Sequence, residues 1–391
     1  MLETLILIYI LIAAALILFD CCFMVVMRLR LYTGKRRMKK HRNMIVRQLE
    51  NLLRGRPIDP DHRKQLLRIM GKATLLPLFS DALDAVKKEV LEEGLIIPTP
   101  DGDGFVRVSR RDGERCLERY VACLAAISEA LFEAYRKQDY TVYTYYIFFL
   151  RKHSLMKHVI NPTVSAYLND LLENGDVWVC DNVMQAIYTA GDPRLVMQAL
   201  RIVDGKETFI HPKLISDGLL GYEGDVMALQ ALLLEERTRF SVQMQVSILN
   251  YIRFSSGAHC ERIFEILLDE EEDDEVRYAC IRYFGKYHYE PVYPILRDYV
   301  NADYSENKEY CLISLTALRN YPGEETVALL TKNLRSTNWY IRYNAAESLN
   351  ALGVEYGELV DIFDGRDGYA RDILQFQFDR RNAKEGEVSM Q

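Results

Sequence analysis

The sequence predicts an all-α protein in which a single N-terminal transmembrane helix is followed by an α-solenoid of helix pairs. Three features of the chain support this fold class. An apolar run extends from Thr4 to Met27 and is broken only by Asp20. An apolar pattern with helical spacing returns at intervals of 31 to 34 residues from Val179 onward. The alternating β-branched runs that form sheets are nearly absent.

The segment 1–27 has the length and composition of a membrane anchor. At about 1.5 Å per residue, its apolar run is long enough to cross a hydrocarbon layer about 30 Å thick. Basic residues follow the run and only Glu3 precedes it, which predicts an outside N-terminus. A cleaved signal peptide would carry its positive charge before the run, and a buried core helix would not be apolar on every face. We therefore expect a single-pass protein of the cell membrane with the bulk of the chain in the cytoplasm.

The interval 28–58 is expected to form a basic juxtamembrane helix. Lys and Arg side chains near a cytoplasmic membrane surface are each attracted to anionic lipid by about 1 kcal/mol. We expect contacts with anionic lipid from Arg28, Arg30, Lys35, Arg36, Arg37, Lys39, Lys40 and Arg42.

Asp20 is the exceptional residue of the predicted anchor. It lies about 10 Å along the helix from Arg28, at a depth where a carboxylate is costly. Asp20 either reaches interfacial water or bonds to a polar residue of a second membrane protein, which would specify pairing. The sequence leaves both interpretations open.

Charge and cysteine usage narrow the function classes. From residue 48 onward the chain has 54 acidic and 40 basic residues, a net charge of −14. This acidic body argues against nonspecific nucleic-acid binding. The eight cysteines form no CxxC pair, which suits a reducing cytoplasm. Cys21 and Cys22 are either acylated or simply membrane-facing.

Four further intervals follow the juxtamembrane helix. A helical linker region is expected at 59–93, with a break or kink at Pro77. Glycine and proline punctuate 94–113, which predicts a loop or small hairpin. Helical periodicity then extends over 114–376, and a disordered tail is expected at 377–391.

The repeat is visible in the first residues of six helical frames. A small or apolar residue follows four positions after each, and in most frames another apolar residue near eight positions after. The frames begin at Val179, Ile210, Val242, Val276, Asn307 and Ile341. A helix pair of this length cannot bury both of its faces alone, so stacked neighbours are expected to share one continuous core.

Two of these frames resemble the first helix of HEAT repeats. They are residues 274–280, DEVRYAC, and 340–346, YIRYNAA, the second followed by SLNALG at 348–353. The resemblance covers about 140–375. It implies that 114–376 is a HEAT-like α-solenoid, curved, binding other proteins and without chemistry of its own. A tetratricopeptide array fits less well because its Trp, Gly and Tyr pattern is missing.

Recurring polar and aromatic residues supply the candidate contacts. Runs of tyrosine cannot all face one core, and exposed tyrosines are typical of binding hot spots. The candidates for protein binding are Tyr143, Tyr146, Tyr278 and Tyr287, with core packing as the alternative for each. A structural ladder with acids is expected from Arg277, Lys308 and Arg342. The acidic run from Asp269 to Glu275 is either a solvated turn or a docking site for a basic segment.

Enzyme signatures are missing from the sequence. It contains no phosphate loop, dinucleotide-binding glycine motif, HExxH or nucleophile elbow. We expect no catalytic residue, metal ligand, cofactor or small-molecule substrate. The expected function is a membrane-tethered scaffold or adaptor that positions a protein partner at the cytoplasmic face. The expected partner is an integral membrane protein, for example an envelope glycosyltransferase. The alternative is a HEAT-like lyase or cofactor-binding enzyme with a site on the concave face.

Overall fold

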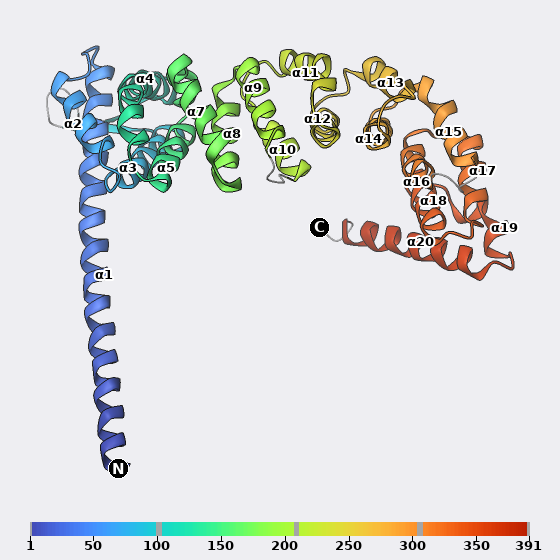
Figure 1. Cartoon of the computed structure of the whole chain (residues 1–391), viewed down its shortest axis with the longest axis horizontal. Coiled ribbons are helices and arrows are strands. Elements are labelled where there is room, and N and C mark those ends of the chain that lie inside the picture. The colour runs from blue at the N-terminus through green and yellow to red at the C-terminus, as the bar shows by residue number, and fades with distance from the viewer. Residues whose placement is uncertain (1, 99–103, 207–210, 303–307, 389–391) are drawn as a thin grey trace. The chain divides into compact units, whose positions relative to one another are not determined.

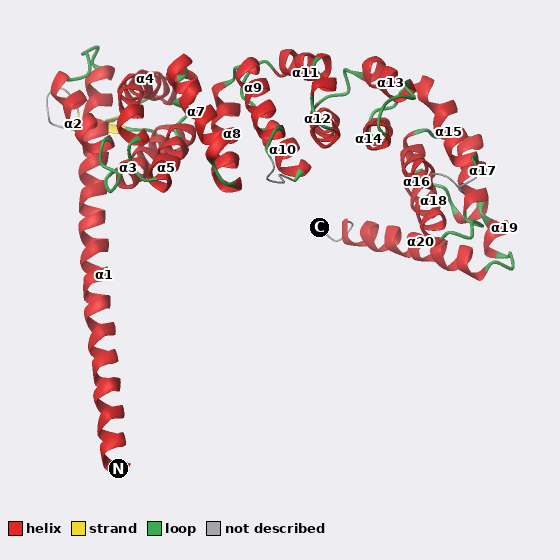
Figure 2. Cartoon of the chain, in the orientation of Figure 1, coloured by secondary structure: helices red, strands yellow, loops and turns green. Residues whose placement is uncertain are grey.

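The computed structural model describes the backbone of residues 2–98, 104–206, 211–302 and 308–388. Within these ranges, the side chains of 2–8, 10–15, 30–31, 93, 98 and 384–388 are not described. The described chain is all-α, as the sequence predicted, and Figure 2 shows strand in one short hairpin only. It divides into two compact units, Met1–Ile202 and Val203–Gln391.

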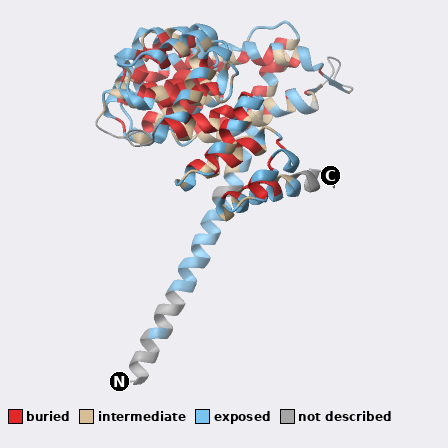
Figure 3. Ribbon diagram, turned by 90° about the vertical axis from the view of Figure 1, so that its right-hand side faces the viewer, coloured by how far each residue is buried: buried red, intermediate tan, exposed pale blue. Residues whose placement is uncertain are grey.

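Helix α1 (Leu2–Leu53) opens the first unit. Its C-terminal turns bury Ile45, Leu49 and Leu52 against α3 and α4, whereas the described side chains of 16–29 are exposed (Figure 3). Among the side chains that the structure describes, no helix is both long and apolar enough to cross a membrane. Much of the predicted anchor, residues 1–8 and 10–15, lies outside the described side chains.

The remaining helices of the first unit begin mostly at side-chain caps. Asp59, Ser109, Asn161 and Asp176 each accept a hydrogen bond from a backbone N–H of the helix that follows. The helices are α2 (Pro60–Met70), α3 (Leu76–Lys88), the π-helical turn Glu89–Glu93, α4 (Arg110–Arg136), α5 (Tyr140–Lys152), α6 (Met156–Val159), α7 (Pro162–Asn174), α8 (Val177–Ala190) and α9 (Pro193–Asp204), the last of which crosses the boundary between the units.

The interval 94–113 contains a two-stranded antiparallel hairpin. Strand β1 (Ile96–Pro98) pairs with β2 (Phe105–Arg107) in the register Ile96 to Arg107. The predicted interval ends late, because α4 already begins at Arg110, where Ser109 caps it.

The second unit is a succession of short helices (Figure 1). Helices α10, α12, α14, α16, α18 and α20 form a series in which each packs against the next, and α13, α15 and α17 each pack against the helix that follows. The helices are α10 (Pro212–Leu219), α11 (Val226–Glu235), α12 (Val242–Ser255), α13 (Cys260–Leu268), α14 (Asp274–Phe284), α15 (Tyr293–Asn301), α16 (Lys308–Ala317), α17 (Glu324–Asn333), α18 (Trp339–Ala351), α19 (Val360–Phe363) and α20 (Gly368–Val388). Four 3₁₀ turns accompany them: Arg237–Arg239, Glu290–Val292, Leu318–Asn320 and Tyr356–Glu358.

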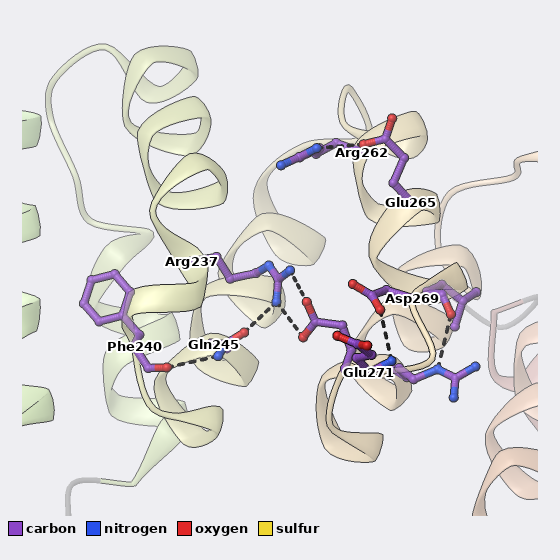
Figure 4. Close-up of polar contacts among 10 residues, drawn as sticks. Arg237, Phe240, Gln245, Arg262, Glu265, Asp269 and Glu271 are labelled. Carbon is purple, nitrogen blue, oxygen red and sulfur yellow. Dashed lines mark hydrogen bonds and ion pairs between the residues drawn. The ribbon is translucent and has the colours of Figure 1, made fainter.

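The acidic run from Asp269 to Glu275 is tied into the second unit. Glu272 accepts hydrogen bonds from both terminal nitrogens of Arg237, whose Nη1 also donates to Gln245 (Figure 4). The carboxylate of Asp273 caps α14. At least part of the run therefore has a structural role.

The prediction of a disordered tail from 377 is wrong as far as Val388, because α20 extends to that residue. Gln377 and Phe378 are buried, and the Phe378 ring lies 5.8 Å from that of Phe363. Arg381 donates to the carbonyl of Val354 at 3.3 Å. These contacts hold the segment as a helix; residues 389–391 lie outside the described chain.

Candidate functional site

A groove of about 530 Å³ lies in the second unit along α12, α14, α16 and α18. Four basic residues line it: Arg253, Arg282, Lys286 and Arg319. We call it the basic groove. Among the described residues that line the groove, Glu309 is the single acidic one. In a body that carries a net −14, the groove thus concentrates positive charge.

The stacking of the helices brings these bases together. Arg253 lies in the last turn of α12, Arg282 in the last turn of α14, and Arg319 in the 3₁₀ turn that follows α16. Helices α12, α14 and α16 pack in series, and residues at their C-terminal ends line the same groove. Basic side chains are favoured at helix C-termini by the helix dipole.

Lys286 has an internal role in the groove. Its Nζ donates to the carbonyls of Arg253 and Phe254, at 3.0 and 3.4 Å, and lies over the Phe254 ring. Lys286 therefore caps the C-terminal end of α12, and the carbonyl oxygens there partly neutralise its charge.

The three arginines have no acidic partner within the described chain. No ion pair engages the guanidinium groups of Arg253, Arg282 or Arg319, and the Nε of Arg253 is buried without a hydrogen-bond acceptor. Burial, together with the charges of Arg282 and Arg319, lowers the pKa of Arg253. Guanidinium groups present paired donors that match carboxylate and phosphate oxygens. The groove can therefore accept an anionic group.

The groove also has an apolar and aromatic side. Leu312 and Ile313 form part of its wall, and Arg253 lies 4.5 Å from the ring centroid of the exposed Phe254. Tyr340, 63% exposed, lines the groove, and the exposed Trp339 lies beside it at a centroid distance of 5.3 Å. Aromatic and arginine side chains together are typical of protein-binding hot spots.

The tyrosines predicted to bind a partner are mostly core residues, so this prediction is wrong for three of them. Tyr143, Tyr146 and Tyr278 are buried, and only Tyr287 is partly exposed. The Tyr146 ring stacks on Tyr135 at 4.1 Å, and its hydroxyl donates to the carbonyl of Ser128. Their rings fill the space between helices, and the hydroxyl of Tyr143 is buried without a hydrogen-bond partner.

The predicted ladder is only partly formed. Arg342 donates twice to Asp367, at 2.8 and 2.7 Å, and so links α18 to the start of α20. Arg277 donates to the carbonyl of Leu267 and to the hydroxyl of Tyr299, so its partners are not acids. Lys308 is exposed and has no side-chain partner among the described residues.

The predicted lipid-contact residues divide into three groups. Arg42 is bound by Glu89 through two hydrogen bonds of 2.8 and 2.7 Å, so its charge is paired within the fold, which argues against the predicted lipid contact. The side chain of Arg30 lies outside the described residues. The exposed members are Arg28, Lys35, Arg36, Arg37, Lys39 and Lys40, and Asp20 is exposed as well.

A triad-like contact in the first unit bears on the alternative of an enzyme. The Oγ of Ser80 lies 2.9 Å from Nε2 of His153, and Asp84 lies 3.7 Å from Nδ1 of His153. Both Ser80 and His153 are fully buried, so a substrate cannot reach the hydroxyl in this conformation. Burial also lowers the pKa of His153 to about 3, which makes it a weak base. The contact joins α3 to the end of α5, and among the described residues no cluster of metal-ligating side chains occurs.

The sequence interpretation missed the bases of the groove. Arg253, Arg282 and Arg319 recur 29 and 37 residues apart, close to the repeat interval. A search for charge at the end of each first helix, rather than at its beginning, would have found them.

Comparison with known proteins assigns no family to this chain. No family model matches it, and no curated protein matches it. One solved structure, an engineered protein from the Northeast Structural Genomics Consortium, aligns with 86% of this chain and 98% of its own length. The two share 13% identity at a TM-score of 0.32, which is too low to assign a shared fold.

Proposed function

We propose that this protein is a membrane-tethered helical-repeat scaffold that binds and positions a protein partner at the cytoplasmic face. The basic groove carries this proposal, because it holds three guanidinium groups against one acid, Glu309, and none of the three forms an ion pair within the described chain. Like charges held together in a partly buried site destabilise the free protein. A bound anionic segment would remove that cost.

The packing of the second unit supports a HEAT-like solenoid. Helices α10 to α20 alternate between a series that stacks helix on helix and partners that pack onto it. In repeat arrays each unit contacts its neighbours only, and the stacked helices form an extended binding surface. The groove lies along that stacked series.

The groove favours a partner with an acidic segment that also carries apolar or aromatic residues. The arginines would bind its carboxylates, and Phe254, Ile313 and Tyr340 would contact its apolar side chains. An integral membrane enzyme, such as an envelope glycosyltransferase, is the partner class that we propose. Confinement at one membrane raises the effective concentration, so a weak contact is sufficient.

The membrane tether is supported by the exposed apolar side chains of α1. Exposed apolar surface of this extent marks an interaction site or a membrane segment. The large apolar side chains exposed from position 16 to 29 are Leu16, Ile17, Leu18, Phe19, Phe23, Met24, Val25, Val26, Met27 and Leu29. After alkaline carbonate extraction the chain is expected in the membrane pellet; its release into the supernatant would contradict the tether.

Affinity isolation of the tagged full chain from its own membranes tests the groove. We compare Arg282→Glu with Arg335→Glu, because Arg335 is exposed in the same unit and does not line the groove. We expect a membrane protein to co-purify with the native chain and with Arg335→Glu, and its amount to fall at least tenfold with Arg282→Glu. Equal recovery with both variants would exclude the groove as the binding site.

A further inference from the structure

A second basic pocket lies in the first unit, separate from the groove. It is enclosed by α1, α2 and the turn that leads into α3, and its volume is about 590 Å³. Arg37 and Lys40 line it from α1, and Arg68 and Lys72 from α2 and the turn after it. We call it the α1–α2 pocket.

The four bases of the α1–α2 pocket are unneutralised. Its described lining residues include no acid, and none of the four bases has a side-chain partner within the described chain. The contrast with Arg42 is informative, since that residue follows Lys40 closely on α1 and is bound bidentately by Glu89. The charge of Arg42, beside the pocket, is therefore neutralised by a carboxylate, whereas the four charges that line the pocket are not.

His41 lies in the wall of the same pocket. It is 7% exposed, and neither of its ring nitrogens has a hydrogen-bond partner. Buried polar groups are nearly always hydrogen-bonded in folded proteins, so an unpaired one calls for an explanation. Burial, followed by the charges of Lys40 and Arg37, lowers the pKa of His41. An anion in the pocket would offset both of those charges.

The N-terminus of α3 adds to the positive potential. Leu75 precedes this helix, offers no side-chain cap and lines the pocket, as does Thr74. The helix dipole gives this end of α3 a partial positive charge, which favours a bound anion, although Pro77 has no N–H and the N–H of Leu76 donates to the carbonyl of Lys72. The pocket thus combines four cationic side chains with a helix N-terminus.

We propose that the α1–α2 pocket binds a phosphate monoester, held by Arg37, Lys40, Arg68 and Lys72. The phosphate belongs either to a lipid headgroup or to a soluble ester. If α1 is the membrane tether, the pocket lies close to the lipid headgroups. Arg37 is only about 8 Å along the helix from Tyr32, an exposed aromatic residue of α1. Binding of a phosphate monoester in the α1–α2 pocket does not depend on whether the basic groove binds a partner.

Calorimetric titration of the full chain in neutral detergent micelles tests the proposal. The soluble probe is glycerol 3-phosphate, and the lipid probe is dioctanoyl phosphatidic acid in the same micelles. The test variants are Arg68→Gln and Lys72→Gln, both at exposed positions that tolerate substitution. The matched control is Arg47→Gln, which removes one exposed charge from α1 outside the pocket.

We expect saturable binding that weakens at least tenfold in Arg68→Gln and Lys72→Gln and less than twofold in Arg47→Gln. Tighter binding of phosphatidic acid by tenfold or more identifies a lipid headgroup as the ligand, and equal affinities identify a soluble ester. The proposal is overturned if neither probe saturates, or if Arg47→Gln weakens binding as much as the pocket variants.

Discussion

Arg237 and Glu272 form a buried ion pair that joins the turn after α11 to the start of α14. Their side chains are 7% and 13% exposed, and Gln245 accepts a further hydrogen bond of 2.6 Å from Arg237 (Figure 4). Gln245 in turn donates to the carbonyl of Phe240 at 3.0 Å. The network connects successive helices of the second unit through polar groups that are nearly all satisfied.

Removing Arg237 is therefore expected to destabilise the second unit. Arg237→Ala leaves the carboxylate of Glu272 mostly buried and unpaired, at a cost of about 3–5 kcal/mol. Arg262→Ala removes an exposed pair with Glu265 on neighbouring α13 and should cost less than about 0.5 kcal/mol. Thermal unfolding of the two variants measures the difference, and equal melting temperatures would show that the buried pair is not stabilising.

Acidification is expected to destabilise the first unit through His153. Burial lowers the folded-state pKa of His153 to about 3. Between about pH 6.5 and pH 3, His153 is therefore protonated in the unfolded chain and neutral in the folded chain. Stability is then complete above about pH 6.5 and falls towards pH 3, by about 2 kcal/mol between pH 7 and pH 5. His62, with a pKa lowered to about 4 by burial, adds a loss of the same sign.

Hydrogen exchange of the amides of α3 and α5 at pH 7 and pH 5, corrected for intrinsic rates, measures this loss. The variant His153→Gln should show a smaller decrease than the native chain. An identical decrease in both would mean that His153 does not cause it.

Helix positions were largely predictable because apolar periodicity encodes which face is buried. The frames from Val242 and Val276 fall at or near the starts of α12 and α14, while Ile210 lies outside the described residues. The faces of the tyrosines were not predictable in the same way. A tyrosine hydroxyl can reach a distant carbonyl, as Tyr146 reaches Ser128, so a polar atom does not prove exposure.

The two basic sites depend on contacts between distant segments. Arg253 and Arg319 are separated by about two repeat intervals of the sequence, and Lys40 and Arg68 belong to different helices. Whether a base is paired, as Arg42 is with Glu89, also depends on tertiary packing. Sequence spacing alone could not distinguish the paired residue from its unpaired neighbours.

Neutralising one arginine of the basic groove is expected to stabilise the free protein. Arg282→Gln removes repulsion with Arg253 and should raise stability by about 0.5–1 kcal/mol, or roughly 1–4 °C in melting temperature. Arg335→Gln, outside the groove, should leave the melting temperature unchanged. A lower melting temperature for Arg282→Gln would show that its charge is satisfied within the fold.

Replacing His41 by leucine is expected to raise stability as well. Leucine fills a similar volume beside Phe79 and removes two buried nitrogens that lack partners, a gain of about 1–2 kcal/mol. Denaturant unfolding of the full chain in micelles measures it. A loss of more than about 1 kcal/mol would mean that the ring has a polar partner in the folded protein.

Site-specific crosslinking in native membranes tests the central claim most directly. A photoreactive benzoylphenylalanine replaces Ile313 in the wall of the basic groove of the full chain. The account predicts a crosslink to one membrane protein that disappears with Arg282→Glu and persists with Arg335→Glu. A crosslink unaffected by Arg282→Glu, or no crosslink to a membrane protein, would contradict it.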